Sequence, residues 1–112
     1  MTTTEIEGLR IPKERAPTPP GALLLEEFLK PLGMTPSELA ERIRVPYVRV
    51  SAFVNGQRRV TRVTPSTALR LAKVFGTSPE FWLNGQLALD LYRTLNDEKE
   101  IGELERIEPV PR

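Results

Sequence analysis

The chain has 112 residues, of which 39% are hydrophobic and 6% aromatic, and a formal net charge of +1, so we expect one domain with a small, mostly aliphatic core. It contains neither Cys nor His, which excludes disulfides, the usual zinc sites, thiol nucleophiles and the commonest general base, and we expect no metal, no cofactor and no enzyme. No segment reaches the roughly 20 apolar residues of a membrane span and the polar start is unlike a signal peptide, so we expect a cytoplasmic protein without membrane contact.

Residues 1–19 are predicted to form a flexible or extended arm, because they show no helical or alternating period. Four prolines are expected to interrupt any strand ladder: Pro12, Pro17, Pro19 and Pro20. The arm also carries three spaced aliphatic residues: Ile6, Leu9 and Ile11. Either these are incidental apolar residues in a tail, or they form a docking peptide that orders on a partner.

A first helix is predicted over residues 21–30, ended by Pro31 and Gly33. Its inward stripe is apolar: Leu24, Leu25, Phe28, Leu29 and, closing it, Leu32. Glu26 and Glu27 are expected on its outer face.

A helix-turn-helix motif begins at Thr35. Thr35 and Glu38 predict a capping box, and Pro36 suits a first helical residue. The inward positions of this helix recur at helical spacing: Leu39, Ala40 and Ile43. Arg44 and Val45 make the turn, where Arg44 is expected to take the positive φ that usually calls for Gly, at a cost of about 1 kcal/mol.

The second helix of the motif is predicted from Pro46 to Asn55 and Gly56, because both closing residues tolerate the left-handed conformation. Its buried side is supplied by Val50, Phe53 and Val54. The remaining side chains can meet base edges in the DNA major groove: Tyr47, Val48, Arg49, Ser51 and Ala52. The basic loop that follows suits DNA phosphates: Gln57, Arg58, Arg59 and Arg62.

Two more helices complete a predicted domain of residues 20–95. Thr64 caps the fourth helix, whose inward positions are Ala68, Leu69, Ala72 and Phe75, while Arg70 and Lys73 stay solvated. Thr77 and Glu80 cap a fifth helix that reaches about Leu95, with Trp82 plugging the core. Apolar residues on two sides of this helix predict subunit contact through Leu87, Leu91, Tyr92 and Leu95. Residues 96–112 are expected to be a charged, mobile tail, with an added helical turn at Ile101, Leu104 and Ile107 as the alternative.

Charge is divided unevenly along the chain. Residues 41–73 carry eight Lys or Arg and one acid, residues 1–40 carry four bases and six acids, and residues 74–112 carry four bases and eight acids. A basic middle between acidic ends is what a DNA-binding face on a nearly neutral protein requires.

Three stretches within roughly residues 19–92 carry a family resemblance: PPGALLLEEFLKPLGMTPSELAERI, VNGQRRVT and TALRLAKVFGTSPEFWLNGQLALDLY. They resemble the phage-repressor-like (XRE) DNA-binding family and, more narrowly, the HigA-type antitoxins of bacterial toxin–antitoxin modules. The resemblance implies an all-α, five-helix, lambda-repressor-like domain. It also implies a homodimer that binds an inverted-repeat operator in double-stranded DNA, represses its own operon and neutralises a RelE-like mRNA-cleaving toxin.

Residue by residue, the resemblance places base reading on Tyr47, Val48 and Ala52, with Arg49 and Ser51 alongside. Phosphate contacts fall on Asn55–Arg59. Arg44 replaces the usual turn Gly and the loop holding Arg62 is longer than usual; both arginines are assigned to phosphate. Toxin contact is assigned to the arm and the first helix: Ile6, Leu9, Ile11, Glu26 and Glu27.

Other classes of protein stay open at this point. One is a free-standing XRE-type regulator without a toxin partner. Another is a protein-interaction module whose helix-turn-helix is vestigial and whose arm and acidic tail bind a basic partner. A hydrolase built on carboxylates is strongly disfavoured, because no acid pair sits in apolar surroundings.

Overall fold

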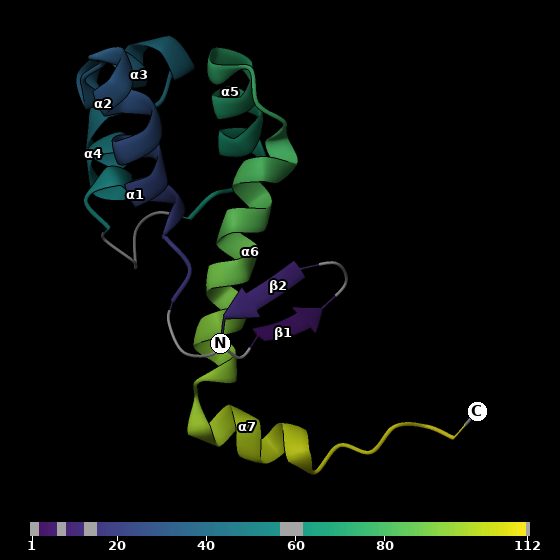
Figure 1. The fold of residues 1–112 in the computed structure, drawn as a ribbon. Coiled ribbons are helices and arrows are strands. Elements are labelled where there is room, and N and C mark those ends of the chain that lie inside the picture. Colours follow the sequence, from purple (N-terminus) through teal and green to yellow (C-terminus); the bar gives the residue numbers. More distant parts are fainter. Residues whose placement is uncertain (1–2, 7–8, 13–15, 57–61, 112) are drawn as a thin grey trace. The chain divides into compact units, whose positions relative to one another are not determined.

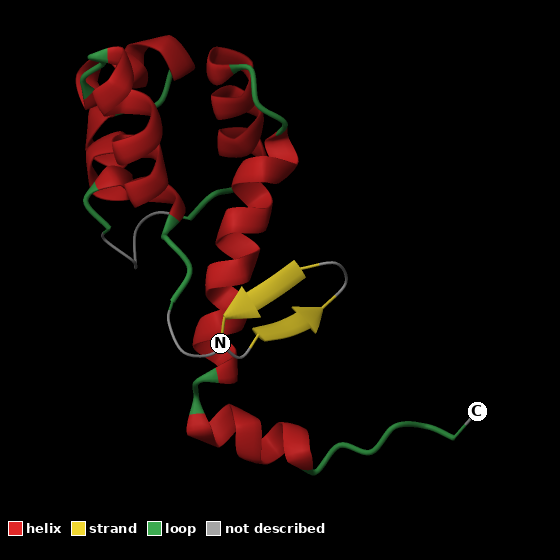
Figure 2. Cartoon of the chain, in the orientation of Figure 1, coloured by secondary structure: helices red, strands yellow, loops and turns green. Residues whose placement is uncertain are grey.

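The computed structural model describes residues 3–6, 9–12, 16–56 and 62–111. Its helical elements are α1 Pro20–Leu24, the π-helical turn η1 Leu25–Leu29, α2 Lys30–Leu32, α3 Pro36–Ile43, α4 Tyr47–Val54, α5 Pro65–Phe75, α6 Pro79–Leu95 and α7 Glu98–Glu105 (Figure 1). The strands β1 Thr3–Ile6 and β2 Leu9–Pro12 form a hairpin (Figure 2). The five predicted helices are present, the first as α1, η1 and α2 in succession, and the all-α class is confirmed. None of the described helices is both long and apolar enough to cross a membrane.

The chain divides into two compact units. Residues 18–86 hold α1 to α5 and the start of α6, while residues 1–17 and 87–112 hold the hairpin, the end of α6 and α7. The first unit contains the helix-turn-helix. The predicted boundaries after residues 19 and 95 stay predictions.

The first helical segment passes through a proline instead of ending at it. Pro31 has no N–H to donate, and its ring crowds the carbonyl one turn earlier. The preceding turn accommodates this by widening: the Lys30 N–H donates to the Leu25 carbonyl, five residues back. Gly33, at φ 64°, then ends the segment, so of the two predicted terminators only Gly33 acts as one.

Trp82 lies at the centre of the core of residues 18–86 and is 0% exposed. Its ring centroid is 5.1 Å from that of Phe28 and 5.0 Å from that of Phe81. The indole Nε1–H donates to Thr77 Oγ1 at 2.8 Å, which satisfies the polar atom that burial would otherwise penalise. The prediction that Trp82 plugs the core is confirmed.

Two leucines predicted to face the core lie on the surface. Leu32 is 62% exposed and Leu69 is 60% exposed. In α5 the buried leucine is Leu71, at 1% exposure. Because α5 has apolar residues on more than one side, its neighbours decide which leucine is buried, and periodicity alone selected the wrong one.

The N-terminal arm is extended, but the expectation that its prolines interrupt any ladder is wrong. β1 and β2 pair antiparallel, with Thr4 opposite Ile11 and Ile6 opposite Leu9. Pro12 lies in the last pair, opposite Thr3, and a proline is tolerated at the end of an edge strand. Strands of four residues are too short for their alternation to stand out in the sequence.

A helix replaces the predicted mobile tail over Glu98–Glu105. Asp97 begins it: its Oδ1 accepts the N–H of Lys99 at 3.0 Å and that of Glu100 at 3.4 Å. The acidic first turn also complements the positive end of the helix dipole. The sequence contains this cap, and the prediction gave more weight to the charge and prolines around it.

Candidate DNA interface

α3 begins as its sequence predicts. Thr35 has extended backbone geometry, and its Oγ1 accepts the N–H of Glu38 at 3.1 Å. Pro36 occupies the first helical position, where a missing N–H leaves no bond unmade. Three side chains of α3 are buried, as expected: Leu39, Ala40 and Ile43. The helix is therefore fixed at its start and along one side.

The turn between α3 and α4 contains the predicted backbone exception. Arg44 has φ 58° and ψ 46°, in the left-handed region, and its N–H donates to carbonyls of Ala40 and Glu41. The Val45 N–H donates to the Ala40 carbonyl at 3.1 Å. Arg70, expected to be solvated, contacts this turn with its guanidinium, donating to the Ile43 carbonyl at 2.6 Å.

The end of α4 lies against α1 at a distance that a glycine makes possible. A Cβ placed on Gly21 would be 1.9 Å from the carbonyl oxygen of Phe53, far inside a normal van der Waals contact. From the sequence, Gly21 was interpreted only as the start of a helix, because the residues next to it in the chain do not show which backbone segment will pack against it. Its role in supporting α4 was missed.

The first turn of α4 presents side chains to solvent. Tyr47 is 53% exposed and Val48 is 73% exposed. Ser51, one turn after Tyr47, is half-buried, and its Oγ accepts from Asn55 Nδ2 at 3.3 Å. At 100° per residue, Tyr47, Val48 and Ser51 share one arc of the helix, which is the shape a major-groove reader needs.

Ala52 does not belong to this face. It is 5% exposed, so the expectation that it reads bases is wrong. In the helix it lies on the far side of Val48 from Tyr47 and Ser51, and it is buried like Val50 and Val54. A small apolar residue suits either a groove or a crowded core, and packing assigned it to the core.

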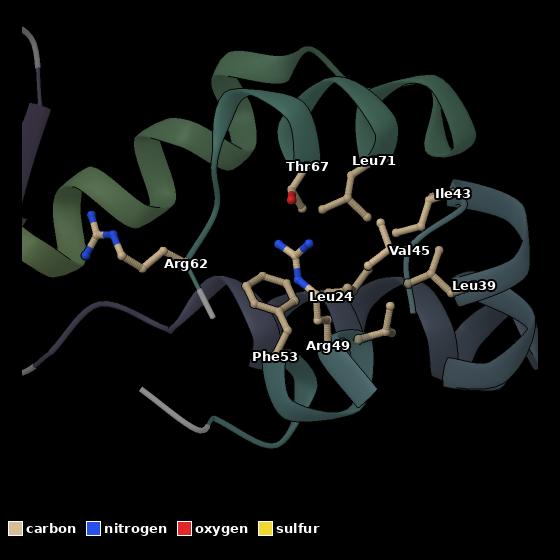
Figure 3. A pocket seen from close by; sticks show the side chains of 10 residues that line it. Leu24, Leu39, Ile43, Val45, Arg49, Phe53, Arg62, Thr67 and Leu71 are labelled. Atoms are coloured by element: carbon tan, nitrogen blue, oxygen red, sulfur yellow. The ribbon is translucent and has the colours of Figure 1, made fainter. Parts of the chain in front are cut away.

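Arg49 is exposed but lies on the flank of α4 that faces α5. It lines a small pocket of about 30 Å³ with residues that include Val45, Phe53, Arg62 and Thr67. Figure 3 shows the Arg49 guanidinium turned toward the space between α4 and α5, while the side chain of Arg62 points away from it. This volume has room for about two water molecules at most. The pocket therefore shows where the Arg49 side chain lies, and it is too small to hold a ligand.

The predicted phosphate contacts are only partly within the described residues. Arg44, Asn55 and Arg62 are exposed, as a phosphate contact requires. Gln57, Arg58 and Arg59 lie outside the described residues. The structure thus brings Arg44 and Asn55 to the two ends of the motif's second helix.

The predicted interface positions on α6 have mixed exposure. Leu87 is 44% exposed, and Leu91, Tyr92 and Leu95 are half-buried. Leu87, Leu91 and Leu95 follow at four-residue spacing and form one stripe.

The predicted toxin contacts fall in both units. Ile6, Leu9 and Ile11 are in the hairpin strands, and Glu26 and Glu27 are exposed on η1. Glu26 pairs with Lys30 at 2.8 Å, an exposed pair of small energetic weight.

Comparison with known proteins identifies relatives across most of the chain. Residues 25–82 match the family described as Helix-turn-helix. The chain is 47% identical over 96 residues to the uncharacterized HTH-type transcriptional regulator YbaQ of Escherichia coli, covering 86% of this chain and 82% of that protein. It is 42% identical over 83 residues to antitoxin HigA-1 of Vibrio cholerae, covering 74% and 75% of the two chains.

One of the similar solved structures contains DNA. The antitoxin HigA of Pseudomonas aeruginosa, solved with the higBA promoter, superposes with a TM-score of 0.72 at 32% identity, covering 85% of this chain and 99% of that one.

Proposed function

Because this chain belongs to the Helix-turn-helix family and to its HigA-type, DNA-binding branch, we propose that it is the antitoxin of a type II toxin–antitoxin module. In this proposal a homodimer binds an inverted-repeat operator in double-stranded DNA and represses its own operon. The same protein neutralises a RelE-like, mRNA-cleaving toxin. The observation that carries the DNA part is the open first turn of α4, with Val48 73% exposed.

Base reading is assigned to the exposed arc of α4. The Tyr47 hydroxyl and Ser51 hydroxyl can exchange hydrogen bonds with base edges, and Val48 can contact a thymine methyl group. Arg49, on the flank beside α5, reaches either a guanine or the DNA backbone. Ala52 has no part in this assignment.

Phosphate contacts are assigned around both ends of α4: Arg44, Asn55, Gln57, Arg58, Arg59 and Arg62. Such contacts supply affinity and register and carry no sequence information. The basic segment of residues 41–73 provides the long-range attraction, because it holds eight Lys or Arg against one acid.

The homodimer is assigned to the α6 stripe of Leu87, Leu91 and Leu95, with Tyr92 beside it. Leu87 supports this, since it leaves an apolar side chain 44% exposed where a second copy would cover it. Two α4 helices related by a two-fold axis would then meet half-sites about 34 Å apart.

Toxin binding is assigned to Ile6, Leu9, Ile11, Glu26 and Glu27. Ile6 and Leu9 are paired across the hairpin, and Ile11 is paired with Thr4. A two-stranded hairpin is marginally stable by itself, so a bound partner would stabilise it.

A second candidate function is a free-standing transcriptional regulator without a toxin. The similarity to YbaQ favours it, since that protein is named as an HTH-type transcriptional regulator and matches over 82% of its length. Both candidates share the DNA interface and differ only in the toxin.

DNA binding is tested on the segment upstream of the chain's own gene. The full-length protein should shift it in a gel and leave a shuffled segment unshifted at the same concentration. Replacing Arg58 and Arg59 together by Ala should weaken binding to all sequences and reduce the salt slope by about 2, one for each lost phosphate contact. An unchanged slope contradicts the phosphate assignment, and no shift by the wild-type protein contradicts the DNA function.

The toxin is tested by expressing the chain with the neighbouring gene and purifying through a tag on this chain. Co-purification of a small basic protein, and rescue of growth when both are expressed, supports the antitoxin. Growth arrest that this chain does not relieve favours the free-standing regulator. Deleting residues 1–18 should abolish co-purification while the operator shift persists; undiminished co-purification removes the toxin contact from the hairpin.

A further inference from the structure

Arg70 joins α5 to the turn between α3 and α4. Its Nη1 donates to the carbonyl of Ile43 at 2.6 Å and lies 3.4 Å from that of Arg44. Its Nε donates to Ser66 Oγ at 3.2 Å, one turn earlier on α5. One guanidinium therefore links its own helix to two consecutive carbonyls that lie 27 and 26 residues before it.

These two carbonyls lie at the C-terminal end of α3, where the helix has no further backbone N–H groups to donate to them. The last C=O groups of an α-helix have no intrahelical partner, and they form the negative end of the helix dipole. Arg44 has already left the helix at φ 58°, so the ladder cannot continue through it. A guanidinium suits this position because it is always charged and its planar donors are held in a fixed fork.

The same turn carries a conformational cost. A non-glycine residue in the left-handed region costs about 1–2 kcal/mol. Among the described residues the other positive φ values belong to glycines, Gly33, Gly56 and Gly76. Arg44 is thus held in a conformation that its side chain disfavours, and Arg70 contacts the carbonyl on each side of its Cα.

The turn also sets the direction of α4. Only Val45 and Pro46 separate Arg44 from the helix, and α4 begins at Tyr47 without a side-chain cap. A change in the turn therefore rotates the first turn of α4, which presents Tyr47 and Val48. A displacement of about 1 Å is enough to misplace a hydrogen bond to a base edge.

We infer that Arg70 is a positioning residue for DNA specificity: it holds the Arg44 turn so that the exposed arc of α4 enters the groove in register. This rests on the proposed contact between α4 and DNA. In this role Arg70 acts through the carbonyls of the protein and neutralises no phosphate. Its loss should therefore lower the preference for the operator over random DNA.

The test compares Arg70→Ala with Lys73→Ala, which removes one positive charge from the same helix and leaves the turn intact. Affinity for the upstream DNA and for a shuffled duplex is measured for full-length proteins at several salt concentrations. Arg70→Ala should weaken operator binding about tenfold, change random-DNA binding less than twofold and leave the salt slope unchanged. Lys73→Ala should leave the ratio of the two affinities unchanged.

Hydrogen exchange supplies a readout in the protein itself. The Val45 amide, bonded to the Ala40 carbonyl at 3.1 Å, should exchange faster in Arg70→Ala and at the wild-type rate in Lys73→Ala. If Arg70→Ala does not fold, Arg70→Lys serves instead, because one ammonium keeps the charge but not the fork. It should lose part of the specificity at an unchanged salt slope.

The outcomes separate the inference from the proposed function. Equal losses on operator and random DNA, with a salt slope reduced by about 1, would make Arg70 a phosphate contact and overturn the inference. An unchanged ratio with Arg70→Ala overturns it as well. Failure of the wild-type protein to prefer the upstream DNA contradicts the proposed function itself.

Discussion

The two helices of the motif have equal length and are held in different ways. α3 and α4 contain eight residues each. Side chains close α3 at both ends, Thr35 at its start and Arg70 at its end. α4 has no side-chain cap at its start, and it depends on buried residues such as Val50 and on the close approach of Gly21 to its last turn. The orientation of α4, the helix proposed to read DNA, is thus set by the elements packed against it. Substitutions far from the proposed DNA contact should therefore change this orientation.

The largest expected effect is at the support of α4. Gly21→Ala should lower the free energy of unfolding by about 3 kcal/mol, because the new methyl group would overlap the Phe53 carbonyl and force α1 and α4 apart. Urea denaturation followed by circular dichroism measures this change. Gly102→Ala is the matched control, since a Cβ there meets no atom within 4 Å, and it should gain about 0.5–1 kcal/mol from helix propensity. Equal effects of the two changes would contradict the close approach.

An intermediate effect is expected at the start of α3. Thr35→Ala removes the acceptor for the Glu38 N–H and should cost about 1 kcal/mol of unfolding free energy. The same denaturation measurement applies. Ser37→Ala, two residues further at an exposed position, should stay within about 0.5 kcal/mol. A Thr35→Ala protein as stable as the wild type would show that α3 does not depend on its cap.

The smallest effect sharpens the comparison at the turn. Arg44→Gly should raise the free energy of unfolding by about 0.5 kcal/mol, because relief of the left-handed strain outweighs the greater freedom of glycine in the unfolded chain. Arg42→Gly, within α3, should instead lower it by about 1 kcal/mol. The same sign for both changes would mean that the turn is not strained.

Local signals predicted the helices in the middle of the chain better than the elements at its ends. The Thr35 cap, the positive φ of Arg44 and the buried Trp82 each follow from a residue and its near neighbours, and each is present in the structure. The hairpin was missed and a helical turn in the region of α7 was only an alternative, because these elements are short, and the prolines and charged residues near them argued against order.

The sequence predicted that the first turn of α4 is exposed, but it did not predict correctly every residue that belongs to the candidate site. Exposure of Tyr47 and Val48 follows from the apolar residues on the other side of α4, which periodicity shows. Ala52 was misassigned, since a short side chain fits either side of a helix. Arg70 is exposed as expected, but its hydrogen bond to the Ile43 carbonyl was not predicted, since a long side chain reaches groups that only the fold brings near. The burial of Ala52 and the contact made by Arg70 both depend on residues outside their own helices, so the pattern within one helix does not predict them.

The amino-acid sequence by itself determined the helices of the domain and the caps at Thr35 and Thr64, because these depend on contacts within about four residues. The cap of α6 is Ser78, whose Oγ accepts the N–H of Phe81, and not the predicted Thr77. Tertiary structure decided which small residue is buried, which leucine of α5 faces the core, that Gly21 must be a glycine, and that the end of α3 is completed by Arg70. Those outcomes depend on groups tens of residues apart that only packing brings together, and packing tolerates neither overlap nor an unpaired carbonyl.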